Sequence, residues 1–201
     1  MLKWSTARED AGHSTGDRES LGLLLKILNE RSPGVLEDLT RVAHFATATA
    51  QGLGLSEAEV ERVELAARLH DVGKLAIPDS ILTKAGPLDS DEWAIMRTHP
   101  EVGQRILAAA PSLAHAAKLV RSQHERYDGR GYPDGLAGEK IVIGARIIAV
   151  CAAFVAMMKH RPFSDAITVT EALAEIRRCS GTQFDPKVVD AFCELLRRAR
   201  E

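Results

Sequence analysis

A histidine and an aspartate stand side by side at residues 70 and 71, and Gly73 and Lys74 follow closely. Adjacent imidazole and carboxylate groups offer a divalent metal two ligands from one turn of chain, and a carboxylate can bridge two metals. The Lys74 ammonium is a compact positive charge suited to a phosphate. A single His-Asp pair is usually incidental, or only a hydrogen-bonded helix end, so its meaning depends on the other polar residues of the chain.

Two further groups of polar residues lie downstream. His99 precedes Pro100 near a predicted helix start, where a histidine can also simply cap or pack, and His124 precedes a glycine-rich loop at residues 128–135. Glycines that adopt positive φ, with Pro133 fixing its neighbour, are needed merely to build such a turn. The loop therefore has two interpretations at this stage, a structural turn or a recognition surface.

The elements that must position these residues are predicted to be helices. Apolar residues recur at three- and four-residue steps, and the run at residues 141–158 is almost continuously apolar without β-alternation. Ser56 and Glu59 form a capping-box pattern, Asp89 is a predicted helix cap, and Asp185-Pro186 is a predicted helix start. The predicted helices cover residues 21–29, 35–53, 56–70, 90–96, 100–110, 112–125, 141–158, 169–179 and 185–200.

This pattern predicts an all-α fold, a helical bundle of about seven or more helices. Residues 1–20 are rich in Ser, Thr, Gly, Asp and Arg, which predicts a flexible polar tail. Residues 21–201 are then one domain, since about 200 residues suffice for a single well-formed core.

Composition excludes several classes of protein. The 26 basic and 28 acidic side chains form no one-signed block, which argues against binding of a nucleic-acid polymer. Three cysteines without CxxC spacing argue against a disulfide framework or a zinc knuckle. No stretch reaches the ~20 apolar residues that span a bilayer, and the polar N-terminus is no signal peptide. We therefore expect a cytoplasmic, soluble domain with no membrane partner; the sequence leaves its oligomeric state open.

Five segments in order make the pattern specific, and with them the chain resembles the HD-GYP family, part of the HD superfamily of metal-dependent phosphohydrolases. The resemblance covers about residues 21–200. Its segments are HDVGKLAIPDSIL, HPEVGQRIL, HERYDGRGYPDGL, GARIIAV and GTQFDP.

The resemblance implies an HD-type all-α bundle that holds two or three iron or manganese ions. A metal-activated water would hydrolyse a phosphodiester of bacterial cyclic di-GMP. The metal positions carried over are His70, Asp71, His99 and His124. The resemblance also makes Asp71 and Lys74 the catalytic candidates, and it makes the loop residues Gly131, Tyr132 and Pro133, with Arg161, the surface for a substrate or partner domain.

Four positions where the family has ligands do not match, which makes this chain a degenerate member. An early Glu and a His fall on Gly34 and Asp38, the first His of a His-His-Glu run falls on Gln123, and a late Asp falls on Ala152. Alanine has no donor atom, and Gln123 is at best a weak neutral ligand. The basic residues that usually follow Arg161 are also absent, which removes charge-assisted hydrogen bonds to phosphate.

Two functional hypotheses follow. The first is a regulatory module that binds a cyclic dinucleotide or a signalling protein domain and hydrolyses poorly. The second is an active phosphodiesterase, or another phosphohydrolase, with a reduced metal site. The cofactor is accordingly one divalent metal, iron or manganese, or none.

Overall fold

The computed structural model describes residues 15–159 and 166–198, and all its regular structure is helical. This confirms the predicted all-α bundle of seven or more helices; no strand forms in the described part. The α-helices are α1 (Thr15–Arg31), α2 (Val35–Gly52), α3 (Glu57–Leu69), α4 (Asp79–Leu82), α5 (Ser90–Met96), α6 (His99–Ala108), α7 (Ala114–Ser122), α8 (Ile143–Met157), α9 (Val169–Arg178) and α10 (Pro186–Arg198). Short 3₁₀ helices are η1 (Val72–Ala76), η2 (Pro111–Leu113) and η3 (Gly138–Lys140).

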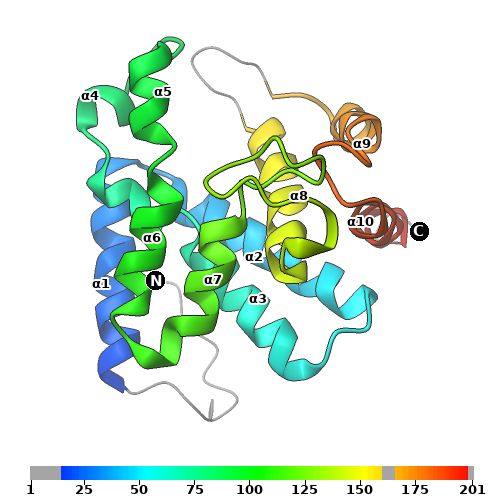
Figure 1. The fold of residues 1–201 in the computed structure, drawn as a ribbon, viewed down its shortest axis with the longest axis horizontal. Coiled ribbons are helices and arrows are strands. Elements are labelled where there is room, and N and C mark those ends of the chain that lie inside the picture. The colour runs from blue at the N-terminus through cyan, green and yellow to red at the C-terminus, as the bar shows by residue number, and fades with distance from the viewer. Residues whose placement is uncertain (1–14, 160–165, 199–201) are drawn as a thin grey trace.

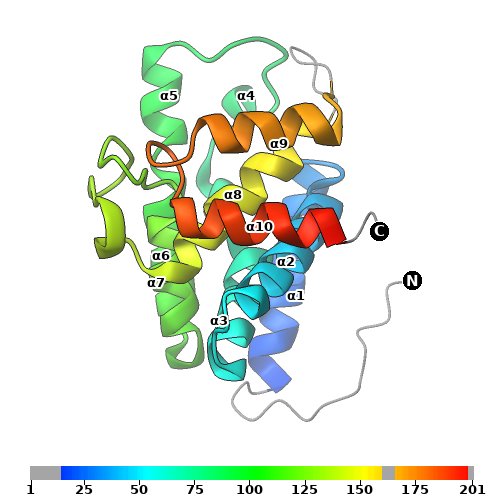
Figure 2. The same cartoon turned by 90° about the vertical axis from the view of Figure 1, so that its right-hand side faces the viewer.

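Helices α2 and α8 form the centre of the bundle. Helix α2 packs against α3, α8 and α10, while α6 packs against α7 and η1. In Figure 1, α1, α6 and α7 lie on one side of this centre, and α9 and α10 lie on the other. Figure 2 shows α9 and α10 crossing in front of α8 and α2. None of the described helices has the length and apolarity to cross a bilayer.

The core is built around α8, as its continuous apolar sequence predicts. Phe45, Phe154 and Phe192, from α2, α8 and α10, contact each other edge-on with ring centroids 5.1–5.8 Å apart. Such edge-to-face pairs stabilise a core beyond the area they bury. Cys151 of α8 is fully buried and its pKa rises to about 12 because of this burial, so its thiol is a core group rather than a ligand.

Two helix boundaries differ by three residues or more from the sequence prediction. Helix α1 begins at Thr15, within the segment predicted to be a polar tail, because the apolar pattern that starts at Leu21 marks packing and not the first helical turn. Helix α7 ends at Ser122, three residues before the predicted end. The chain therefore leaves the helix before His124, which lets the following loop fold back over α6.

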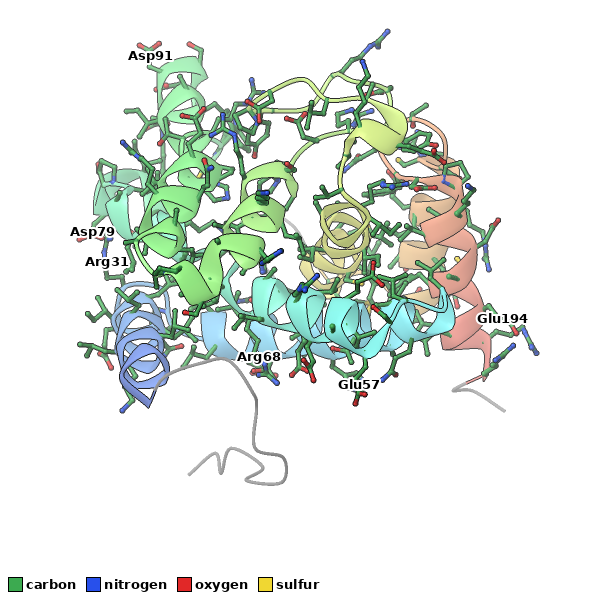
Figure 3. The ribbon with its side chains drawn as sticks, turned by 60° about the horizontal axis from the view of Figure 1, so that its bottom comes forward. Arg31, Glu57, Arg68, Asp79, Asp91 and Glu194 are labelled. Carbon is green, nitrogen blue, oxygen red and sulfur yellow. The ribbon has the colours of Figure 1, made fainter. Side chains whose placement is uncertain are left out.

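Helix α1 is held beside η1 by one arginine. The Arg31 guanidinium donates to the carbonyl oxygens of Leu75 and Ile77 and to the Asp79 carboxylate, at 2.6 Å in its closest contact with Asp79. Arg31 and Asp79 lie together at the edge of the molecule in Figure 3. This contact closes the segment that follows the His-Asp pair against the N-terminal helix.

Candidate functional site

The His-Asp pair lies where α3 ends. His70 is the residue that follows α3, and Asp71 precedes η1. A Cβ atom at Gly73 would collide with the carbonyl oxygen of His99 and the backbone nitrogen of Gly103. Glycine is therefore needed for η1 to lie against α6, and this close approach brings His99 beside Asp71.

The His70 and His99 imidazoles face the Asp71 carboxylate. The Nε2 atoms of His70 and His99 each lie 3.7 Å from a carboxylate oxygen of Asp71. Their Nδ1 atoms lie 2.8 Å from the carbonyl oxygens of Ala67 and Met96, three residues earlier in each case. A carbonyl can only accept, so Nδ1 donates in both rings and Nε2 points at the carboxylate. A hydrogen bond from Nδ1 to a backbone carbonyl is the contact that orients metal-binding histidines.

Asp71 is ionised and paired with a lysine. Its burial alone would raise the carboxyl pKa, but the nearby Lys74 ammonium, at 2.7 Å, and the adjacent imidazoles hold the pKa well below its usual range. The side chain of Asp71 is only 13% exposed, so Lys74 neutralises a largely buried charge.

His99 and His124 are neutral and bonded to each other. Burial lowers the pKa of His99 to about 4 and that of His124 to about 3. Their Nε2 atoms lie 3.1 Å apart. Because His99 already carries its proton on Nδ1, His124 must donate from Nε2. The Nε2 atoms of His99 and His124 are therefore joined by one hydrogen bond.

The loop after α7 is held over this cluster by a buried glutamate. Glu125 is 4% exposed and accepts from the backbone nitrogens of Asp134 (2.6 Å) and Leu136 (3.1 Å). The structure thus gives Glu125 the role of loop anchor. A side chain at Gly131 would collide with the backbone of Glu125, so the loop turns tightly at that point.

Tyr132 covers the histidine pair. Its ring stacks on His124 with centroids 5.0 Å apart and an interplanar angle of 8°. The Tyr132–Pro133 peptide is cis. Burial, assisted by the Asp71 charge, raises the pKa of the Tyr132 hydroxyl to about 12, so it stays protonated. Gly131, Tyr132 and Pro133 thus lie beside the predicted metal positions, whereas Arg161 lies outside the described residues.

The non-matching positions contact other groups. The Asp38 carboxylate lies 2.5 Å from the Lys159 ammonium, and a Cβ atom at Gly34 would lie 3.8 Å from the same nitrogen. Gln123 is 3% exposed and donates to the His70 carbonyl oxygen. Ala152 is half-buried against the main core.

The residues present do not fit the family's set of two or three ions. No three His, Cys, Asp or Glu side chains within residues 15–159 and 166–198 are arranged to hold a metal ion. Lys159 places its ammonium between two of the four positions where a ligand is missing, and Lys74 holds the carboxylate of the His-Asp pair. The arrangement still presents an ammonium, a tyrosine and imidazoles together, which suits an anionic, ring-bearing ligand.

Sequence reasoning missed three groups here. Lys159 contacts a residue 121 positions away, and Glu125 is engaged by backbone groups 9 and 11 residues later. Arg97 lies over the Tyr132 ring, with 5.5 Å between the guanidinium carbon and the ring centroid. No local pattern marks such contacts, although the charge of Lys159 near the end of an apolar helix was a visible signal.

The chain matches known proteins over most of its length. The family described as HD domain matches residues 22–188. The cyclic di-GMP phosphodiesterase response regulator RpfG of Xanthomonas campestris pv. campestris is 45% identical over 178 residues, which is 88% of this chain and 47% of that protein. A cyclic di-GMP phosphodiesterase of Thermotoga maritima is 41% identical over 157 residues, 77% of this chain and 43% of that protein. The chain thus spans less than half the length of these two curated relatives.

Solved structures share the fold. A cyclic GMP-AMP-specific phosphodiesterase of Vibrio cholerae superposes with a TM-score of 0.68 at 22% identity, covering 90% of this chain and 48% of that one. The HDG"Y"P protein Bd1817 of Bdellovibrio bacteriovorus gives the same TM-score at 15% identity, covering 90% of this chain and 63% of that one.

Proposed function

Because the chain belongs to the HD-GYP branch of the HD domain family, we propose that it is a cyclic di-GMP signalling domain that binds its ligand and hydrolyses it poorly or not at all. Relatives that are named phosphodiesterases of cyclic di-GMP and of 3'3'-cGAMP support the ligand class. A signalling protein domain that docks on the loop at residues 128–135 is the second partner that the proposal admits.

The observation that carries the proposal is the ion pair between Asp38 and Lys159. A metal ion and an ammonium repel each other, so an ion at this point would have to displace Lys159 from a contact of 2.5 Å. Ala152 supplies no replacement donor on the neighbouring helix. HD-domain phosphohydrolases are generally metal-dependent, so hydrolysis should be the first activity that such a chain loses.

Binding does not need the missing donors. The Lys74 ammonium can exchange the Asp71 carboxylate for a phosphate oxygen of the ligand, and the Tyr132 ring, stacked on His124, belongs to the same cluster of side chains. A charge-assisted hydrogen bond to a buried phosphate stabilises a complex by about 1.5–3 kcal/mol. His99 and His124 are neutral and therefore add no positive charge to the site.

The alternative is an active phosphohydrolase that holds one divalent ion, iron or manganese. It is favoured by the orientation of His70 and His99, whose Nε2 atoms both face Asp71. When bound, such an ion would supply an activated water at neutral pH. To admit it, Lys74 must release Asp71 and the hydrogen bond between His99 and His124 must open.

The test combines binding, turnover and metal content on the full chain, purified anaerobically without an affinity tag. We expect saturable cyclic di-GMP binding in calorimetry, no linear product by chromatography with added Fe²⁺ or Mn²⁺, and well under one ion per chain by elemental analysis. Lys74→Met should weaken binding about tenfold or more. Lys118→Met, which removes an equal charge from an exposed position on α7, should not.

Other results would contradict the proposal. Rapid metal-dependent turnover that His70→Ala abolishes would establish the alternative. If the chain bound no cyclic dinucleotide, both the proposed binding module and the alternative enzyme of this class would be refuted.

A further inference from the structure

A cation stacked between aromatic rings lies at the outer edge of the candidate site. The Arg97 guanidinium carbon is 5.9 Å from the centroid of the Trp93 ring and 5.5 Å from that of Tyr132. Both distances lie within the ~6 Å range of cation–π attraction. Trp93, on α5, is 46% exposed, so the outer end of this arrangement faces solvent.

The rings continue inward from Arg97 towards the His-Asp pair. Tyr132 stacks on His124, and His124 contacts His99 edge-on with centroids 4.8 Å apart. His99 in turn faces Asp71 at 3.7 Å. These contacts connect the exposed Trp93 to the Asp71 carboxylate, which is paired with Lys74.

The Arg97 guanidinium has no hydrogen bond or ion pair with any residue in the described ranges 15–159 and 166–198, although many other arginines there hold a carboxylate. Arg121, for example, holds Asp134 through two nitrogens at 2.7 Å each, and Arg126 holds Asp128. Arg97 is exposed, and its aromatic contacts leave its N–H donors without a protein partner in these ranges. An arginine held in this way is prepared to bind a planar pair of acceptors.

We infer that Arg97 and Trp93 form a subsite for a guanine base, in which the Arg97 N–H groups donate to O6 and N7 and the base stacks on Trp93. Guanine presents two adjacent acceptors along this edge, whereas adenine presents N7 beside an N6 donor that repels the guanidinium. The exposed indole favours a base over a phosphate, because a planar base can stack on the indole ring and a phosphate cannot. The inference rests on the proposed binding of a cyclic dinucleotide and adds the selectivity of that site.

The subsite predicts an order of affinity among three ligands. A bidentate arginine–guanine contact discriminates by about 5- to 150-fold, and the exposure of Arg97 favours the lower part of this range. Cyclic di-GMP should bind best. The mixed 3'3'-cGAMP can turn its one guanine to Arg97 and should bind roughly twofold more weakly for statistical reasons. Cyclic di-AMP has no guanine and should bind about fivefold or more below cyclic di-GMP.

The experiment is titration of the full chain with each of these three ligands in EDTA, followed by calorimetry and by tryptophan fluorescence in a Trp4→Phe background. This background leaves Trp93 as the sole tryptophan of the chain. Arg97→Ala and Arg97→Lys should both reduce binding of the two guanine ligands and bring all three affinities together, because lysine keeps the charge but not the paired donors. Trp93→Ala should weaken all three ligands by a similar factor of about five or more.

Arg105→Ala is the matched control, since it removes an exposed arginine from α6 and should leave the order unchanged. Equal weakening of all three ligands by Arg97→Ala would mean a phosphate contact and overturn the guanine subsite. Unchanged affinities in Arg97→Ala would also overturn it while the proposed function stands. If none of the three ligands binds the natural chain, the proposed function fails together with the subsite.

Discussion

Restoring two of the missing donors should convert this domain into a metal-binding one. The variant combines Asp38→His and Ala152→Asp with Lys159→Ser, which removes the ammonium that now holds Asp38. Gly34 is left unchanged because its φ of +85° would strain any side chain there. The new histidine and carboxylate then join His70 and Asp71 as candidate ligands for one ion.

The expected size of the effect follows from the contacts that change. The Asp38–Lys159 pair has side chains 27% and 38% exposed, so its loss should cost at most about 1 kcal/mol. A ligand at 100 times its dissociation constant stabilises the folded state by about 2.7 kcal/mol. In a domain of this size 1 kcal/mol moves the melting temperature by about 2–4 °C, so saturating Mn²⁺ should raise it by about 5–11 °C over EDTA.

The assay is thermal melting with Mn²⁺ or EDTA, paired with elemental analysis after desalting. Ala153→Asp in place of Ala152→Asp provides the control, because it adds the same carboxylate about 100° around α8. We expect about one ion per chain in the restored variant and little in the control. The reasoning fails if the natural chain already holds stoichiometric metal, or if the restored variant and the control take up metal equally.

Three further predictions concern the fold around the site. Gly73→Ala forces a Cβ atom against the His99 backbone and should cost about 1–3 kcal/mol; a melting temperature lowered by less than about 2 °C would count against this close approach. Asp185→Asn leaves the buried Arg146 guanidinium without its charge partner and should cost about 3–5 kcal/mol in urea unfolding, whereas an unchanged midpoint would show that the pair is dispensable. Burial raises the pKa of the Cys151 thiol to about 12, so iodoacetamide at pH 8 should not modify this thiol until the chain is unfolded. Labelling of Cys151 in the folded chain, detected by mass spectrometry, would contradict this prediction.

Much of the scaffold could be predicted because its signals are local. The Asp89 carboxylate accepts hydrogen bonds from the backbone nitrogens of Asp91 and Glu92, as the side chain of an N-cap residue does. Asp185 accepts from the Lys187 nitrogen at 2.8 Å where α10 begins. The continuous apolar sequence of α8 likewise predicted a buried helix, since only the core can cover every face of it.

The long-range contacts of the site could not be predicted in this way. The contact between Asp38 and Lys159 depends on where α2 begins and where α8 ends, because one residue more in α8 would turn the lysine by about 100°. The approach of Arg97 to Tyr132 depends on a loop whose path is fixed by Glu125. The family resemblance identified the members of the His-Asp cluster, but it did not show which of them bond to each other.

Two lysines can neutralise the carboxylates of the site without a metal ion. Asp38 and Asp71, both partly withdrawn from water, each have an ammonium within 2.7 Å. A carboxylate without such a partner would be destabilising in this setting, and a metal would then be required for folding. Since Lys159 and Lys74 already neutralise the carboxylates, we expect EDTA to leave the melting temperature of the natural chain unchanged. A fall of several degrees in EDTA would mean that a bound ion, and not the lysines, compensates these charges.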